Sequence, residues 1–194
     1  MRQFVPPPLQ VEPIEPGTTP ARFSPQWLKW FTDIANRNLY YGVFYSMETQ
    51  AADTLGAPQA VRFEKVKAQT QVVIPDQKTK IRFRASGLYR IIFEARFVSS
   101  TAIRETASIW IRHNGQDVED SAVQTFLVAG DGEYVYLHAL QGVNAGDYLE
   151  IYWLTTSVGV KLFAAEAAPG FVPGSPSARI EISQVELWDA TSRF

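Results

Sequence analysis

In a stretch in the middle of the chain, every second side chain is apolar. Between residues 89 and 97, Tyr, Ile, Phe, Ala and Phe occupy the odd positions, while Arg90, Glu94 and Arg96 lie among the even ones. Successive side chains of a β-strand point to opposite faces, so a period of two predicts a strand with one buried face. This pattern constrains the fold more than any other feature of the sequence.

Short apolar segments separated by turn residues continue from about residue 40 to the C-terminal end. Asn114-Gly115 is a strong hairpin signal, because a type I′ turn needs positive φ at both central positions. A break in the alternation between Ile182 and Val185 predicts a β-bulge. The segments that precede residue 89 are 40–44, 60–63, 71–74 and 80–84. About nine or ten strands with no helical pattern between them predict an all-β, antiparallel jelly-roll sandwich.

Proline is concentrated at the start of the chain, where residues 1–25 hold seven of the 12 prolines. Proline fixes φ and lacks an N–H, so this segment is expected to be extended and partly polyproline II. A disordered leader is the alternative interpretation. We expect residues 1–38 to form an arm and residues 39–194 to form the jelly-roll domain.

A short aromatic helix is predicted within this arm, at about residues 24–36. Ser24 is placed to cap its N-terminus, and Pro25 occupies the first helical position, where its missing N–H costs nothing. The helix either caps the core of the domain or anchors the chain to another protein, and the preceding prolines favour the anchor. The expected anchor residues are Pro6, Pro7, Pro8, Phe23, Trp27, Leu28, Trp30 and Phe31.

Charge and composition argue against several classes of function. The net charge of −2 and the pI of about 5.7 leave no basic surplus for binding nucleic acid. The sequence has no apolar run long enough to span a membrane, and its start lacks the apolar core of a signal peptide. The absence of cysteine excludes thiolate metal sites and cysteine nucleophiles.

Catalytic motifs are equally scarce. His113 and His138 do not have the spacing of metal ligands, and the sequence contains neither a G-x-S-x-G elbow nor a P-loop. Asp117, Glu119 and Asp120 follow the Asn114-Gly115 turn and could form a calcium site or a solvated turn, but their spacing is not that of an EF-hand. We therefore expect no enzymatic activity, no catalytic residue, no metal and no cofactor.

Two tryptophans in predicted strands receive opposite interpretations. Trp153 shares its face with Leu149 and Ile151 and is expected in the core. Trp110 lies on the face opposite Ile109 and Ile111, so it is expected to point outward, toward a subunit interface or a sugar. The candidates for surface recognition are Trp110, His113, Asp117 and Asp131.

Several motifs resemble those of a known family. Residues 109–122 are similar to the W-x-R-x-N-G-x-x-(V/I)-x-x-S hairpin of C1q/TNF-like jelly rolls in bacteriophage virion proteins. Residues 87–91 resemble the G-x-Y-x-(I/V) strand start of these domains, and residues 143–153 resemble their L-x-A-G-D-x-(V/L)-E-(L/I) strand. The resemblance covers about residues 40–190. The proline-rich arm with its Trp-Leu helix resembles the N-terminal peptide of small podovirus-type virion proteins.

The resemblance implies a homotrimeric accessory virion protein that is assembled in the bacterial cytoplasm. Such a cement, head-fibre or spike protein would attach to the major capsid protein, or to another head or tail protein, through its arm. The chain lacks the collagen-like stalk of many C1q proteins, so a cytokine-like role is not expected. With this resemblance, a subunit interface is favoured over a sugar for Trp110. The alternative function is a tail-associated fibre or a receptor-binding module that recognises a host-surface glycan.

Overall fold

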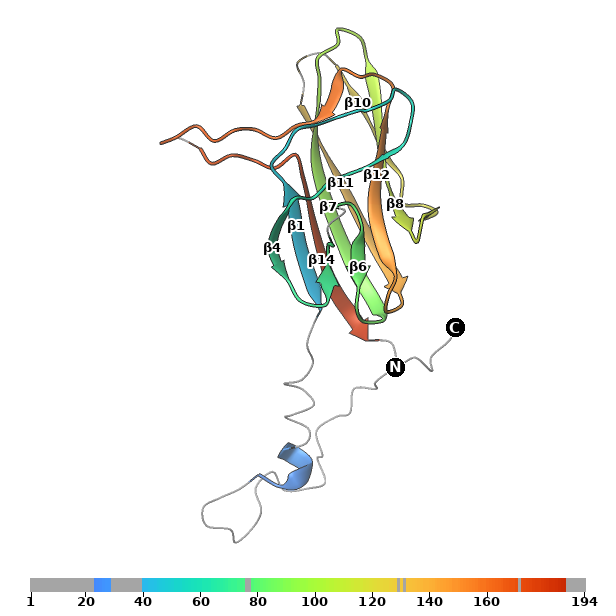
Figure 1. The fold of residues 1–194 in the computed structure, drawn as a ribbon, viewed down its shortest axis with the longest axis vertical. Coiled ribbons are helices and arrows are strands. Elements are labelled where there is room, and N and C mark those ends of the chain that lie inside the picture. Colours follow the sequence, from blue (N-terminus) through green and yellow to red (C-terminus); the bar gives the residue numbers. More distant parts are fainter. Residues whose placement is uncertain are drawn as a thin grey trace.

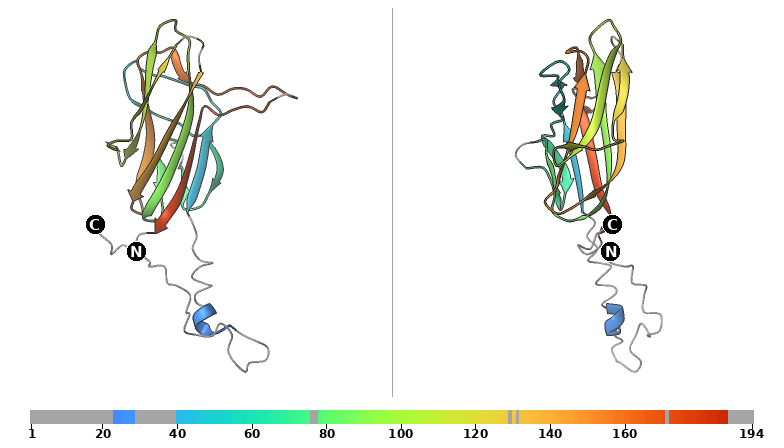
Figure 2. Two further views of the ribbon diagram at one scale, coloured as in Figure 1. Left: turned by 180° about the vertical axis from the view of Figure 1, so that it is seen from behind. Right: turned by 90° about the vertical axis from the view of Figure 1, so that its right-hand side faces the viewer.

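The chain folds into a sandwich of two antiparallel sheets. A computed structural model describes residues 23–28, 40–75, 78–128, 130, 132–170 and 172–187. Within these residues, fourteen strands are divided between the two layers, which are seen face-on in Figure 1 and from the side in Figure 2. This architecture confirms the predicted all-β, antiparallel jelly roll.

The first layer, called the β7 sheet, is built around its longest strand. It contains β1 (Tyr41–Ser46), β2 (Gln50–Ala51), β4 (Lys65–Gln69), β7 (Gly87–Ser99), β11 (Gly132–Val143), β13 (Val160–Leu162) and β14 (Ala178–Leu187). One edge of β7 pairs first with β14, along residues 87–95, and then with β13, along residues 97–99. The other edge pairs with β11. The main order is therefore β4–β1–β14–β7–β11.

The second layer, called the β8 sheet, carries the predicted hairpin. It contains β3 (Gln59–Ala60), β5 (Val72–Val73), β6 (Ile81–Phe83), β8 (Glu105–His113), β9 (Gln116–Asp117), β10 (Val123–Leu127) and β12 (Tyr148–Thr155). Its main order is β10–β8–β12–β6–β5. From β10 to β13 the chain alternates between the two sheets: β10 and β12 belong to the β8 sheet, and β11 and β13 to the β7 sheet. Segments that are distant in the sequence thereby become neighbours.

Apolar side chains from both sheets meet between the layers. Phe97 on β7 lies with its ring centroid 5.8 Å from that of Trp153 on β12, and Phe83 contacts Tyr89 at 4.7 Å. All four are almost completely buried. Burial of one large apolar side chain contributes roughly 1.5–3 kcal/mol, so this interlayer core holds the sheets together.

The alternation seen in the sequence is reproduced along β7. Its odd-numbered residues from Tyr89 to Phe97 are at most 2% exposed, while its even-numbered residues face outward. The bulge expected in the last strand is present, because the register of β14 against β7 shifts between Gln184 and Glu186. The Asn114-Gly115 turn has φ angles of 50° and 82°, as a type I′ turn requires.

Some sequence predictions at the level of single elements are wrong. The described residues form more strands than the nine or ten expected, because several strands contain only two or three residues. The exposed strand β4 was not predicted, because its five residues KVKAQ include only two apolar ones, Val66 and Ala68, which are too few to indicate a buried face. The strand expected at 60–63 is confined to β3, although the Val61 amide still donates to the Ile151 carbonyl at 2.8 Å.

The start of the predicted helix lies within the described residues. Residues 25–28 are helical, and the Leu28 amide donates to the Ser24 carbonyl at 3.0 Å. The expected side-chain cap is wrong, because the buried Ser24 Oγ has no hydrogen-bond partner within the described chain. The rest of the helix to residue 36 lies outside the described residues, as do Pro6, Pro7, Pro8, Trp30 and Phe31.

Candidate functional site

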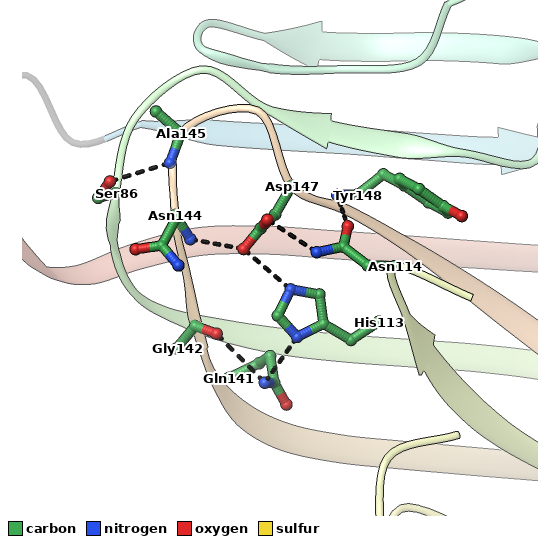
Figure 3. A network of polar contacts seen from close by, with 9 residues as sticks. All are labelled: Ser86, His113, Asn114, Gln141, Gly142, Asn144, Ala145, Asp147 and Tyr148. Atoms are coloured by element: carbon green, nitrogen blue, oxygen red, sulfur yellow. Dashed lines mark hydrogen bonds and ion pairs between the residues drawn. The ribbon is translucent and has the colours of Figure 1, made fainter. Parts of the chain in front are cut away.

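A polar network at one end of the sandwich joins two turns (Figure 3). His113 Nε2 lies 3.0 Å from Asp147 Oδ2, and Asn114 Nδ2 donates to Asp147 Oδ1 at 2.8 Å. The Asn144 amide also donates to Asp147 Oδ2, at 2.8 Å. The carboxylate thus links the β8–β9 turn to the β11–β12 turn.

The same network extends to the neighbouring strand and loop. Gln141 on β11 lies with Nε2 3.4 Å from His113 Nδ1, and Asn114 Oδ1 accepts from the Tyr148 amide at 3.0 Å. The Ser86 hydroxyl accepts from the Ala145 amide at 2.9 Å. Side-chain oxygens of the network thus accept hydrogen bonds from backbone amides of the turns and hold the turns in place. The geometry supports a structural role for the network.

Two opposing influences act on the pKa of Asp147. Burial is the largest single influence and by itself raises this pKa, because it disfavours the charged carboxylate. Hydrogen bonds from Asn114, the Asn144 amide and His113 favour the charged form, and together they hold the pKa of Asp147 below its usual value. The carboxylate therefore stays ionised at neutral pH.

A second cluster lies on the outward face of the β8 sheet, and we call it the Trp110 platform. It consists of Trp110 and Arg112 on β8, Asp117 on β9 and Tyr152 on β12. Trp110 Nε1 donates to Asp117 Oδ1 at 2.7 Å, and Arg112 Nε donates to the same oxygen at 2.5 Å. The Arg112 guanidinium lies 4.0 Å from the centroid of the Tyr152 ring, while the ring centroids of Trp110 and Tyr152 are 6.0 Å apart.

Arg112 and Asp117 each stabilise the charged form of the other. The hydrogen bond to Asp117 is the main cause that raises the pKa of Arg112, and hydrogen bonds from Arg112 and Trp110 lower the pKa of the Asp117 carboxyl. Both groups therefore remain ionised over the physiological range. Because Asp117 is 59% exposed, the pair is screened by water and fixes orientation more than it adds stability.

The structure brings together only part of the set predicted for surface recognition. Trp110 and Asp117 are hydrogen-bonded partners, whereas His113 lies in the turn network, with its side chain 24% exposed. Asp131 lies outside the described residues. Arg112 and Tyr152 were not predicted. The alternation of β8 could have indicated Arg112, two residues after Trp110, but Tyr152 joins only through the pairing of β8 with β12.

The outward face of the β7 sheet has a different character. Tyr134, Tyr136 and Leu140 alternate along β11 with buried residues and are 51%, 55% and 63% exposed. Opposite them on β7 lie Arg96, Glu94 and Arg90, with the half-buried Ile92 between the last two. Large apolar side chains thus form a row along an edge strand, and we call this row the β11 edge.

Of the expected anchor residues, Phe23, Trp27 and Leu28 are described. Phe23 and Leu28 are 47% and 51% exposed, and Trp27 is half-buried. Within the described part of the chain, no three His, Cys, Asp or Glu side chains are grouped as a metal site would require. The described helical residues also include no helix long and apolar enough to cross a membrane.

Comparison with known proteins supports the fold. No family model matches the sequence, and no curated protein is similar to it. Among solved structures, the Eiger TNF protein of S. frugiperda superposes with a TM-score of 0.52 over 81% of this chain and 99% of that one. The chain has a TNF-like jelly-roll fold. With 13% sequence identity, the similarity between the two TNF-like jelly rolls concerns the fold alone.

Proposed function

We propose that this TNF-like jelly roll is a non-enzymatic, homotrimeric structural protein of a bacteriophage particle. Three copies associate through the β11 edge, and the arm of residues 1–38 attaches them to the capsid. The virion assembles in the bacterial cytoplasm, and the partner of the arm is the major capsid protein or another head or tail protein. The motifs at residues 109–122 and the proline-rich start support the phage assignment, because both resemble segments of virion proteins.

The β11 edge is the observation that carries the proposed self-association. Soluble monomers rarely expose several large apolar side chains side by side, and aromatic residues are enriched at protein interfaces; in this row only the exposed His138, between Tyr136 and Leu140, is polar. Tyr134, Tyr136 and Leu140 lie on one face of an edge strand, where a second copy can reach them. A closed cyclic assembly would cover this row on every copy and leave none exposed.

The first test is the native mass of the full-length chain, measured by light scattering after size exclusion. We expect about three times the chain mass of 21.8 kDa. The double variant Tyr136→Glu, Leu140→Glu places charges at the β11 edge and should convert the trimer to monomers without unfolding them, since both side chains point outward. A charge costs several kcal/mol when it is buried unpaired in an interface.

The matched control is Val158→Glu, which places the same charge on a residue that is 60% exposed in the turn before β13. It should leave the trimer intact. A monomeric wild-type protein, or a double variant that remains trimeric, would overturn the proposed association. The alternative function, a receptor-binding module, depends instead on the Trp110 platform.

A further inference from the structure

We propose that the Trp110 platform binds a neutral saccharide, with Trp110 as the stacking surface and Asp117 and Arg112 as hydrogen-bonding partners. The inference names the ligand class for the receptor-binding alternative given above. It rests on the proposed function in one respect, because a trimer would present three platforms. It concerns the outward face of the β8 sheet, so it is independent of the β11 edge.

The platform is organised before any ligand arrives. Asp117 Oδ1 accepts from both Trp110 and Arg112, and these two bonds fix the tilt of the indole ring. Tyr152 packs beside it at 6.0 Å. A surface aromatic ring that is already held in one orientation loses little conformational entropy on binding, which favours weak ligands such as sugars.

Polar groups lie at the rim of the aromatic surface. Both bonds to Asp117 end on Oδ1, and Oδ2 has no hydrogen bond to any described residue. Arg112 has five N–H donors, of which Nε is used by Asp117. A pyranose presents C–H groups on one face and hydroxyl groups around its edge, so it can stack on Trp110 while its hydroxyls reach Asp117 and Arg112.

The surroundings distinguish this platform from a protein interface. Next to it on the outward face are Thr106 and Ser108 on β8 and Gln124 on β10, whose Nε2 lies 3.4 Å from Ser108 Oγ. On this face the other large apolar side chains, Phe126 opposite Thr106 and the half-buried Leu154 opposite Ser108, are separated by these polar groups and form no continuous apolar core of the kind found in protein interfaces. Aromatic rings set among polar side chains suit a sugar, which has both C–H and hydroxyl groups.

The local charge favours a neutral ligand. Arg112 is neutralised by Asp117, and the nearby Glu150 is buried with Oε1 accepting from Thr79 at 2.9 Å. Two further cations lie close to Tyr148 at the start of β12: Lys80 and, on β6, Arg82 are 4.6 Å and 5.7 Å from the centroid of its ring. Positive and negative groups are thus interspersed, and the Arg112–Asp117 pair carries no net charge that would select an acidic sugar.

The test uses the full-length protein on an array of immobilised oligosaccharides. The array contains neutral chains of hexose, deoxyhexose and N-acetylhexosamine, together with sialylated and uronic acid chains. We expect the wild-type protein to bind at least one neutral chain, and the affinity is then measured with the same oligosaccharide in solution. Trp110→Ala should weaken binding by about tenfold or more, because it removes the stacking surface.

Asp117→Asn is the second variant, since it keeps the shape of the side chain and an acceptor for Trp110. It should weaken binding by several fold. Phe126→Ala is the matched control, because Phe126 is a 53% exposed aromatic residue on the same face, and its ring contacts Arg104 rather than the platform. It should leave the affinity unchanged.

The inference is overturned if the wild-type protein binds no neutral chain, if it binds only acidic chains, or if Trp110→Ala binds as tightly as the wild type. The native mass of each sample separates this result from the proposed function. A trimer that binds no sugar contradicts the saccharide site alone. A monomer that binds a neutral sugar supports the site and contradicts the proposed trimer.

Discussion

At the scale of single residues, the turns of this jelly roll depend on side chains that replace missing backbone partners. Asp147 accepts hydrogen bonds from His113, Asn114 and the Asn144 amide, and its side chain is only 17% exposed. Asn114 in turn holds the Tyr148 amide. Two turns that are distant in sequence are thereby fixed by one carboxylate.

Replacing Asp147 by Asn should destabilise the protein by about 1.5–3 kcal/mol at neutral pH, since bonds to a charged acceptor are stronger than neutral ones. The measurement is urea unfolding as a function of pH. The pKa of Asp147 is lowered in the folded state, so its contribution is complete above the ordinary carboxyl pKa of about 4 and is lost as the pH falls through and below that value. The difference between wild type and variant should therefore shrink in acid.

Glu119→Gln is the control, because Glu119 is an exposed carboxylate close to the same hairpin. It should change stability by less than about 0.5 kcal/mol at every pH. A loss for Asp147→Asn that is the same at neutral and acidic pH would contradict the electrostatic account and leave only the geometry of the turn.

At the scale of elements, the sequence predicted the long strands because their period of two is forced by one buried face. β7, β8, β12 and the bulge in β14 follow from that rule. The strand β4 does not follow from this rule, because nearly all of its side chains are exposed. It is defined by its pairing with β1. Local pattern therefore predicts strands that supply core residues, and not those that are defined by pairing alone.

The candidate site divides in the same way. Trp110 and Asp117 belong to one hairpin, so their proximity follows from the Asn114-Gly115 turn. Tyr152 is brought to Trp110 by the register of β12 against β8, which pairs residues 36 to 48 positions apart and leaves no local signal. The turn network has the same origin, because His113 ends β8 whereas Asp147 lies in the distant β11–β12 turn.

The hairpin also contains a position whose role only the structure reveals. Ser121 Oγ accepts from the Ile111 amide at 3.0 Å and donates to the Val118 carbonyl at 2.7 Å. The side chain thus continues the pairing of β8 after β9 has ended. Ser121→Ala would leave a buried amide without a partner, and we expect a loss of about 1–3 kcal/mol in the free energy of unfolding.

Denaturant unfolding of Ser121→Ala measures this loss. Ser108→Ala is the control, since Ser108 Oγ has only the exposed, 3.4 Å contact with Gln124. Equal stability of the two variants would show that a water molecule replaces the hydroxyl at Ile111.

At the scale of the whole molecule, the sandwich places different chemistry on its two outward faces. The β7 sheet carries the apolar row of the β11 edge, while the β8 sheet carries the polar surroundings of the Trp110 platform. A trimer that buries the first face and exposes the second would multiply weak contacts with a repeated ligand, because linked sites raise the effective concentration. If both proposals hold, assembly and recognition use opposite faces of the sandwich and do not compete.

The last prediction concerns the arm. Every buried apolar residue found in the described chain lies between Phe44 and Ile182, within the expected jelly-roll domain. The double variant Trp27→Ala, Trp30→Ala should therefore keep the trimeric mass and the melting temperature of the wild type. It should fail to sediment with phage particles that lack the protein, because burial of each large aromatic side chain contributes roughly 1.5–3 kcal/mol to an anchor. Lys29→Ala, between the two tryptophans, is the control and should still sediment. If the double variant instead loses its trimeric mass, the helix belongs to the body of the protein and the anchor hypothesis is wrong.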